Sequence, residues 1–418
     1  MEQTPPVPAS DVYPPVQQDV ARLAGLPEVR SAFGRFRLEE AQFAHWQMEV
    51  SRVASPPFGE GPRGEWLADR FRQIGLTDVQ IDEVGNVFGV RPGYGGRFVS
   101  LSAHIDTVFP STTPLNIRQQ GSRLYGPGVS DNGAGITAML AVASVLSSSR
   151  ISHALPFVFI GNVGEEGEGD LRGMRHVFQT PRWRDAIAYS VIVDGAGSDT
   201  VVAEALGSRR FEVIARGPGG HSWSDFGTPN PIFVLARAIQ FFTETPVPAS
   251  PKTTFNVGVI RGGTSVNSIP ESASMRVDLR STSMAEIDRL ERALRIALDH
   301  AVDIENRPAA PRGPRRTQIV QCEVVEIGNR PAGELAADAR LLKVIRTVDA
   351  QLGNTAQVQR ASTDANIPLS LGREAVAIGG GGTGGGAHTL QEWFDCNGRD
   401  LGLRRILLTM LALSGVGE

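Results

Sequence analysis

Several residue classes that mark specialised proteins are scarce in this sequence. Only two of the 418 residues are cysteines, Cys322 and Cys396, so neither a disulfide framework nor a four-cysteine zinc site can form. No apolar run reaches the roughly 18 residues that a membrane-spanning helix needs. An excess of charge of one sign is also missing, because 41 basic residues face 45 acidic ones. Without a basic field to attract nucleic acid or anionic lipid, we expect neither a nucleic-acid partner nor a membrane partner.

The remaining composition is that of an ordinary globular protein. Hydrophobic residues make up 41% and charged residues 21% of the chain, which argues against wholesale disorder. The length predicts two or three domains of roughly 100–200 residues each. Residues 1–30 open with a Pro-rich stretch and are expected to form a mobile arm. This stretch has neither the charged nor the apolar region of a signal peptide. The sequence as given therefore favours the cytoplasm, and export only if a signal peptide has been removed.

Short apolar strands alternate with helices through the first half of the chain. Strands are expected at 98–106, 155–163 and 190–194, with a strongly apolar helix at 133–149. Val- and Ile-rich strands separated by helices are typical of an α/β fold, with a mostly parallel sheet covered by helices on both faces. Further expected elements are helices at 38–54 and 64–75 and a hairpin at 79–93.

A second pattern begins near residue 208. Its expected elements are, in order, a strand at 209–216, a helix at 231–242, strands at 253–262 and 272–281, a helix at 284–302 and a strand at 318–327. The order βαββαβ is that of a ferredoxin-like α+β domain, in which two helices cover an antiparallel four-stranded sheet. We therefore expect an inserted domain at 208–328, inside a first domain built from 1–207 and 329–418. That domain resumes with a helix at 334–352, a strand at 375–379 and a closing helix from residue 399.

Polar residues follow the carboxyl ends of the expected parallel strands, where ligands bind in such sheets. They are His104, Asp106, Glu165, Glu166 and Asp194. Imidazole and carboxylate groups are zinc ligands, and a carboxylate beside a ligand histidine can orient its ring. Each of these residues alone is also typical of an ordinary polar loop or turn. Their convergence on one edge of one sheet favours a site.

Two further candidates lie beside glycine-rich segments. Asp131 precedes a Gly-rich turn into the apolar helix, where it can bridge two cations or simply cap the helix. His388 follows the run GGGGTGGG at 379–386, which permits close backbone approach to a site but is also typical of a flexible linker. Jointly the candidates supply two histidines and three or four carboxylates. That set suits two zinc ions sharing a carboxylate, as in hydrolases whose paired metals lie about 3.5–4 Å apart.

Four motifs taken together, SAHIDTV, GVSDNGAG, VGEEGEG and RGPGGHSW, resemble the dizinc exopeptidase and aminoacylase family. This family includes peptidase T, glutamate carboxypeptidase, carnosinase, acetylornithine deacetylase and succinyl-diaminopimelate desuccinylase. The resemblance covers about residues 60–415 and is nearest to peptidase T-like members. It implies a zinc exopeptidase catalytic domain, with the inserted domain serving as lid and dimerisation domain.

The resemblance also implies a role for each candidate residue. His104 and Asp194 would bind one zinc ion, Glu166 and His388 the other, and Asp131 would bridge both. Glu165 would be the general base and later the proton donor to the leaving amine, and Asp106 would orient His104. In the inserted domain, His221 would polarise the scissile carbonyl, in dimeric members from the partner subunit, and Asn267, Arg280 and Arg330 would contact substrate. Each of these last three is also typical of an ordinary surface residue.

Two residues bear on the substrate class, and they favour different substrates. In the resembled family an aspartate at the position of Asp194 is typical of aminopeptidases and dipeptidases, which favours a peptidase T-like aminopeptidase or tripeptidase acting on short peptides. Arg330 would instead grip a substrate carboxylate, which keeps open a carboxypeptidase or N-acyl-amino-acid amidohydrolase on the same dizinc site. The implied cofactor is two Zn²⁺ per subunit, with Co²⁺ or Mn²⁺ as substitutes.

Two further possibilities concern self-association and a different class of function. The antiparallel sheet of the lid offers an edge strand through which a homodimer can form. A metal-free binding protein that kept the fold would be marked by a missing ligand or a missing base. The full candidate set is present in this sequence, which favours the enzyme.

Overall fold

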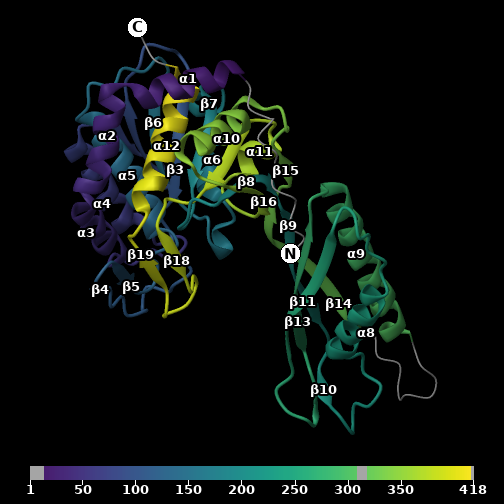
Figure 1. Ribbon diagram of the computed structural model, residues 1–418. Coiled ribbons are helices and arrows are strands. Elements are labelled where there is room, and N and C mark those ends of the chain that lie inside the picture. Colours follow the sequence, from purple (N-terminus) through teal and green to yellow (C-terminus); the bar gives the residue numbers. More distant parts are fainter. Residues whose placement is uncertain (1–13, 308–317, 416–418) are drawn as a thin grey trace. The chain divides into compact units, whose positions relative to one another are not determined.

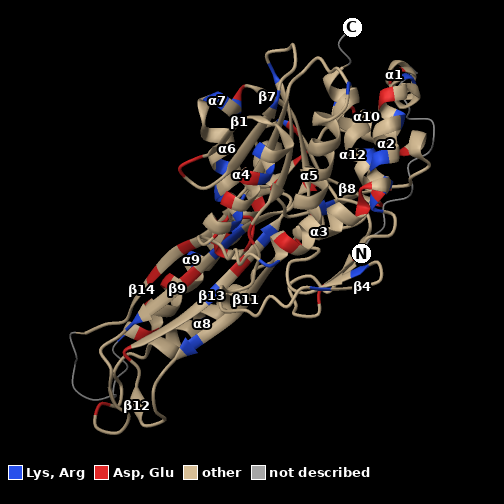
Figure 2. Ribbon diagram, turned by 90° about the vertical axis from the view of Figure 1, so that its left-hand side faces the viewer, with Lys and Arg blue, Asp and Glu red and all other residues tan. Residues whose placement is uncertain are grey.

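The computed structural model describes residues 14–307 and 318–415. The chain divides into two compact units, one made of Met1–Ala205 and Gly333–Glu418 and the other of Leu206–Ala332. In Figure 1, whose colours follow the sequence, the inserted unit has the teal to green part of the colour scale. The inserted unit thus begins two residues before, and ends four residues after, the expected 208–328. Basic and acidic residues are interspersed over both units (Figure 2).

The first unit is built on a nine-stranded mixed sheet with the order β1-β2-β6-β3-β7-β17-β8-β15, in which β16 pairs with β8. The strands are β1 Thr77–Ile81, β2 Val87–Arg91, β3 Phe98–His104, β6 Phe157–Asn162, β7 Ile187–Val193, β8 Thr200–Ala205, β15 Gly333–Glu334, β16 Gln357–Ala361 and β17 Glu374–Ile378. The central strands β6, β3, β7 and β17 are parallel, whereas β1, β2 and β15 pair antiparallel. The predicted α/β class with a mostly parallel sheet is confirmed.

Helices cover both faces of this sheet, as predicted. One face packs against α4 Gly61–Ile74, α5 Gly133–Ser147, α10 Arg340–Leu352 and α12 Arg399–Ser414, with α1 Pro14–Gly25, α2 Pro27–Leu38 and α3 Glu40–Ser51 outside them. The opposite face packs against α6 Arg172–Gln179, α7 Pro181–Arg184 and α11 Asn366–Ser370. Helix α5 is apolar almost all round because it is buried between the sheet and neighbouring helices. Arg405 of α12 donates two hydrogen bonds to Asp349 of α10, at 2.7 and 2.8 Å, in a buried ion pair.

The expected mobile arm at 1–30 is wrong for residues 14–30, which belong to α1 and the start of α2. Val20, Leu23 and Val29 are buried in the main core, and α1 contacts α10 and α12. The helical spacing of these apolar residues satisfies the pattern of an amphipathic helix. The Pro-rich stretch before these residues led to the prediction of a mobile arm instead of a helix. Residues 1–13 of the expected arm lie outside the described residues.

The second unit has the predicted βαββαβ order. Its elements are β9 Gly207–Arg216, α8 Pro231–Thr243, β11 Thr253–Gly262, β13 Ser272–Ser281, α9 Met284–Asn306 and β14 Gln321–Arg330, with a small ribbon of β10 Gly220–His221 and β12 Ser268–Ile269. The antiparallel sheet has the order β11-β13-β9-β14, so β11 and β14 are edge strands. Both helices pack on one face of this sheet, around Phe211, Val213, Leu235 and Leu290.

The glycine run belongs to a second small sheet of the first unit and is not a linker. This sheet has the order β18-β19-β5-β4, with β18 Thr383–Gly385, β19 Trp393–Asp395, β5 Arg123–Tyr125 and β4 Arg118–Gln120. Gly381 has φ +87°, and a β-carbon there would lie 2.4 Å from the main-chain oxygen of Arg399. A β-carbon on Gly384 would lie 2.3 Å from Oγ of Ser130. The run is therefore required by close backbone packing.

The sequence predicted neither a membrane-spanning helix nor a disulfide framework, and both expectations can be compared with the described residues. No helix within 14–307 and 318–415 has both the length and the apolarity to cross a membrane. Cys322 and Cys396 are both free thiols, and burial raises the pKa of each to about 11.

Candidate metal centre

The candidate ligands come from the carboxyl edge of the main sheet and from two loops beside it. His104 is the last residue of β3, and Asp194 follows the last residue of β7. In the register of these neighbouring strands Ser102 pairs with Ile192, so His104 and Asp194, two residues further on, reach the same edge. Asp131 lies just before α5, and the cap of that helix is Asn132, whose side chain accepts from Gly135 N. Asp131 is therefore not the capping residue.

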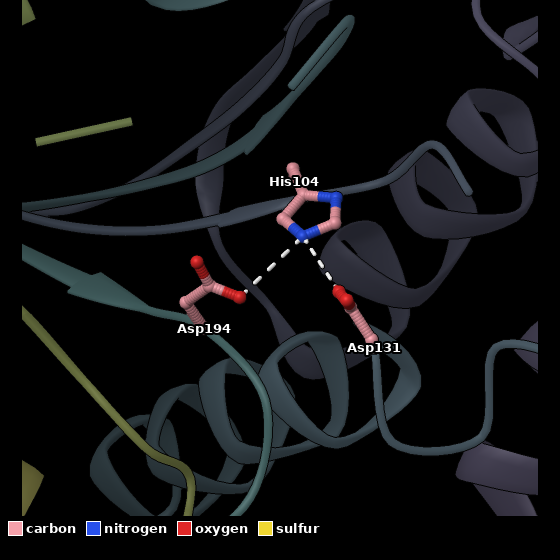
Figure 3. A group of neighbouring side chains, drawn as sticks. All are labelled: His104, Asp131 and Asp194. Atoms are coloured by element: carbon pink, nitrogen blue, oxygen red, sulfur yellow. Dashed lines mark ion pairs between the residues drawn. The ribbon is translucent and has the colours of Figure 1, made fainter. Parts of the chain in front are cut away.

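One group of side chains forms around His104. Its Nε2 lies 3.1 Å from Asp131 Oδ1 and 3.7 Å from Asp194 Oδ1, and Figure 3 shows both carboxylates facing this nitrogen. One ligand atom from each of the three residues lies within 4.8 Å of the others. His104 is buried and the two aspartates are half-buried. The arrangement has the size and composition of a cation site.

A second group forms around His388. Its Nε2 lies 3.0 Å from Asp131 Oδ2 and 2.9 Å from Glu166 Oε1. These three residues also present ligand atoms within 4.8 Å of one another. Asp131 therefore belongs to both groups and turns one oxygen towards each.

Asp106 supports this centre through the backbone of the acidic loop. Its Oδ1 accepts from Glu165 N at 3.0 Å and its Oδ2 accepts from Glu166 N at 2.8 Å. Oδ1 also lies 3.6 Å from Nδ1 of His104. Nδ1 of His104 lies closer to the main-chain oxygen of Asp106, at 3.2 Å. Asp106 thus contacts the ring of His104 and holds the backbone of the two glutamates, which are both buried.

The electrostatics reflect carboxylates and imidazoles crowded together away from water. Burial opposes the charged form of His104, but Asp106, Asp131 and Asp194 raise its pKa well above the ordinary value. A hydrogen bond with Asp131, together with Glu166, raises the pKa of His388 to about 9. Burial raises the pKa of Glu166.

The pKa values of Asp131 and Asp106 shift in the opposite direction. Burial disfavours their charged forms, but His104 and His388 hold the pKa of Asp131 well below its usual range. His104 and the two amide donors lower the pKa of Asp106 in the same way. In this site the imidazoles and carboxylates stabilise each other's charge.

The donor set fits a pair of divalent cations. Asp131 Oδ1 is buried and has no hydrogen-bond partner, although Nε2 of His104 lies only 3.1 Å away. A cation bound between these two residues would satisfy this oxygen. Two imidazoles and three carboxylates, without a thiol, suit Zn²⁺ and also Co²⁺ or Mn²⁺.

The remaining predicted site residues belong to the second unit. His221 is exposed on β10, where its Nδ1 accepts from Trp223 N at 3.2 Å and its own N–H donates to Asp225 at 2.7 Å. Asn267 lies in the neighbouring loop, and its carbonyl accepts from Ser222 N at 3.0 Å. The structure thus places His221 and Asn267 side by side.

Arg280 and Arg330 lie on another part of this unit, in one row of its sheet. Both pair with Ser208 of β9, Arg280 from β13 and Arg330 from β14, so their side chains share a face. This face is opposite the helices, because residues that alternate with Ser208, such as Phe211 and Val213, point into the helix-covered core. Nε of Arg280 donates to Asp278 at 2.6 Å.

Two buried acids near the centre are absent from the predicted site residues. Asp364 accepts from Asn162 at 2.6 Å, and burial raises its pKa to about 7. Glu392 is fully buried and accepts three main-chain N–H groups, and burial raises its pKa to about 7. Asp364 lies in the segment STDANIPLS at 362–370, which resembles a Thr-Asp segment of the same family, so the sequence carried a weak signal for it. Glu392 carried none, because an isolated glutamate ordinarily indicates a solvated surface.

Comparison with known proteins agrees with this arrangement. Residues 100–410 match the sequence pattern described as peptidase family M20/M25/M40. An Aspergillus clavatus protein named "Probable carboxypeptidase" is 30% identical over 203 residues, 44% of each chain. Carboxypeptidase G2 of a Pseudomonas species is 23% identical over 243 residues, 56% of this chain and 58% of that one. The chain spans about half the length of the relatives it matches in sequence.

Solved structures extend the likeness over nearly the whole chain. Aminopeptidase PepT from Bacillus cereus superposes with a TM-score of 0.70 at 19% identity, over 90% of this chain and 99% of its own. Human carnosine dipeptidase 1 superposes with a TM-score of 0.70 at 13% identity, over 92% and 98%. At these identities the likeness establishes the shared fold.

Proposed function

The chain belongs to peptidase family M20/M25/M40, and from this premise we propose that it is a metal-dependent exopeptidase that removes the amino-terminal residue of short peptides. The observation that carries the proposal is the pair of three-residue clusters that share Asp131. Two clusters with one common carboxylate are the arrangement that two-metal hydrolases use. The cations we assign to them are two Zn²⁺ per subunit.

Each ligand has a defined place in this proposal. His104 and Asp194 would hold one cation, Glu166 and His388 would hold the other, and Asp131 would contribute to both. Cations bound here would supply Lewis acidity, which lowers the pKa of a water and polarises the carbonyl of the bond to be cleaved.

The proton chemistry falls to Glu165. It precedes the ligand Glu166 directly and lies in a buried loop, so its carboxylate can accept the proton of the attacking water and return it to the leaving amine. Asp106 keeps this loop in place through the main-chain N–H groups of both glutamates. The same carboxylate orients His104.

His221 is the residue that we assign to stabilising the developing oxyanion. Its ring is exposed and its Nδ1 is engaged with main-chain N–H groups, which leaves Nε2 as the atom for a substrate oxygen. In dimeric members of the resembled family this histidine acts from the partner subunit. The edge strand β11, on which Val259 and Ile260 are exposed, is the element that we assign to a homodimer contact.

Asp194 favours amino-terminal recognition, and the name of the structural neighbour PepT agrees with it. A carboxypeptidase or an N-acyl-amino-acid amidohydrolase is the second candidate, and two observations support it. Arg280 and Arg330 lie in one row of the sheet of the second unit, on the face opposite its helices; Arg330 is buried and Arg280 donates to Asp278, and a guanidinium group is suited to bind a carboxylate. The sequence relatives are also named carboxypeptidases.

One experiment separates these candidates. A free tripeptide, its N-acetyl form and its C-terminal amide are each incubated with the zinc-loaded protein, and products are followed by chromatography against a chelated control. Cleavage of the free and amidated peptides alone establishes the aminopeptidase. Cleavage of the acetylated peptide but not of the amide establishes the second candidate and contradicts the interpretation of Asp194. No cleavage of any peptide contradicts both.

A further inference from the structure

Glu392 is a fully buried acid whose two carboxylate oxygens both bond to the loop that carries Asp131. Its Oε2 accepts from Gly128 N at 2.8 Å. Its Oε1 accepts from Ser130 N and from Asp131 N, each at 2.7 Å. Three short, charge-assisted hydrogen bonds from consecutive parts of one loop determine the path of its backbone.

The opposite side of this loop is held by α3. Nε2 of Gln47 donates to the carbonyl of Val129, and Oγ of Ser51 donates to the carbonyl of Gly128 at 3.3 Å. Three N–H groups of the loop therefore bond to Glu392, and the carbonyls of Gly128 and Val129 bond to side chains of α3. Hydrogen bonds thus hold the segment before Asp131 from two sides, and its backbone groups are paired away from water.

The position of Glu392 in the chain links the two groups of candidate metal ligands. It lies four residues after His388, and its main-chain oxygen accepts from Gly126 N at 2.9 Å. The segment that supplies His388 to one cluster thus also fixes the loop that supplies Asp131 to both. A shift of this loop changes the distance of Asp131 from His104 and from His388 together.

We propose that Glu392 is the positioning residue of the metal centre, which sets the bridging carboxylate of Asp131 at the correct distance from both cations. This inference rests on the proposed metal-dependent function. Glu392 does not touch the cations or the substrate in this assignment. It acts through the backbone of residues 128–131.

The chemistry of the site requires a carboxylate rather than an amide. Gln would keep one acceptor oxygen, but its NH₂ group would meet at least one main-chain N–H that now donates to Glu392. Two donors facing each other leave a buried N–H without a partner. Glu392→Gln therefore changes the loop while keeping the size and shape of the side chain.

The test measures cation binding by the full-length protein independently of peptide cleavage. Metal-free wild type and Glu392→Gln are titrated with Co²⁺, followed by calorimetry and by the visible absorption of the bound ion. We expect the affinity of Glu392→Gln for the cation pair to fall at least about tenfold, the range typical of residues that support metal ligands. Its Co²⁺ spectrum should change, and in peptide assays kcat should fall more than KM changes.

A matched control distinguishes positioning from general loss of stability. Asp349 of α10 is also a buried acid that accepts charge-assisted hydrogen bonds, from Arg405, but it belongs to neither cluster. Asp349→Asn should lower the melting temperature and leave Co²⁺ affinity and spectrum unchanged. If Glu392→Gln does not fold, Glu392→Asp replaces it, since its shorter side chain cannot reach all three N–H groups.

The outcomes are distinct. If the folded Glu392 variant has the same Co²⁺ affinity and spectrum as the wild type, the inference is overturned. It is also overturned if the wild-type protein binds fewer than two cations. Weakened binding in the Glu392 variant together with unchanged binding in Asp349→Asn supports it. A wild type that binds two cations but cleaves no peptide contradicts the proposed function and leaves the inference to be decided by the Co²⁺ titrations alone.

Discussion

Oδ1 of Asp131 lies 3.1 Å from Nε2 of His104 and yet accepts no hydrogen bond from it. A buried carboxylate oxygen that has no donor is costly. The other oxygen of Asp131 lies 3.0 Å from His388. This relationship makes the aspartate the residue on which both clusters depend.

Metal content should therefore respond differently to three substitutions. Asp131→Ala removes the shared ligand and should abolish binding of both cations. Asp194→Ala and His388→Ala each remove a ligand of one cluster, so each should keep one cation per chain. Metal analysis of zinc-loaded protein after desalting measures the stoichiometry. Asp338→Ala, at an exposed position, is the control and should match wild type, and two cations in Asp131→Ala would contradict the bridging role.

Glu165→Ala should remove turnover while keeping the metal. The proposed base touches the reacting water and is not needed to hold a cation, so kcat should fall by at least about 100-fold with unchanged zinc content. Peptide cleavage and metal analysis on the same sample test this. Glu168→Ala, an exposed acid in the same loop, should keep full activity. Full activity in Glu165→Ala would remove this residue from the mechanism.

Protein stability should depend on pH through His153. Its ring is buried, Nδ1 lies 2.8 Å from the carbonyl of Leu155, and Nε2 accepts from Arg91 at 2.9 Å, an arrangement that needs the neutral ring. Burial, and secondarily Arg91, lowers its pKa. Between this lowered pKa and the ordinary value near 6.5, the unfolded chain binds more protons, so stability rises with pH and is lost as the pH falls through that window.

Urea unfolding of metal-free protein at pH 5.5 and 7.5 measures this effect. Wild type should lose more stability on acidification than His153→Gln, by about 1.4 kcal/mol for each unit of pKa shift. His45→Gln, at an exposed helix position, should behave like wild type. Equal losses in wild type and His153→Gln would contradict the assignment.

Gly381 should tolerate no side chain. Its φ is +87°, and a β-carbon would lie 2.4 Å from the main-chain oxygen of Arg399. Gly381→Ala should therefore lower the free energy of unfolding by at least about 1 kcal/mol. Gly96→Ala, where a β-carbon meets no atom within 4 Å, should change it by less than about 0.5 kcal/mol. Equal urea midpoints for the two variants would show that the close packing of the glycine run does not contribute to the free energy of unfolding.

The sequence contained enough information to predict the strands that carry the ligands. β3, β6 and β7 are short apolar runs that end in polar residues, and the carboxyl ends of parallel strands meet at one edge. Their convergence therefore followed from topology alone. The assignment of ligands to separate cations came from the family resemblance, because Glu166 and His388 are 222 residues apart in the chain.

Other features depend on tertiary contacts that no local pattern reveals. β16, with the sequence QVQRA, is too polar to be recognised as a strand, and only its pairing with β8 defines it. Glu392 is buried because a loop 262 residues earlier presents main-chain donors to it. Side-chain chemistry alone favours the surface for such a residue. The glycine run resembled a linker because the atoms that crowd it come from distant segments.

The interrupted first unit has a consequence for biosynthesis. During translation the ribosome completes the contiguous segment Leu206–Ala332 before it adds β17, which lies between β7 and β8 in the finished sheet. The inserted unit can thus form its own core while the sheet of the first unit still lacks β17. His388 and Glu392 emerge later still. A chain that ends before them lacks His388, one of the residues to which we assign a cation, and we therefore expect it to lack the proposed activity.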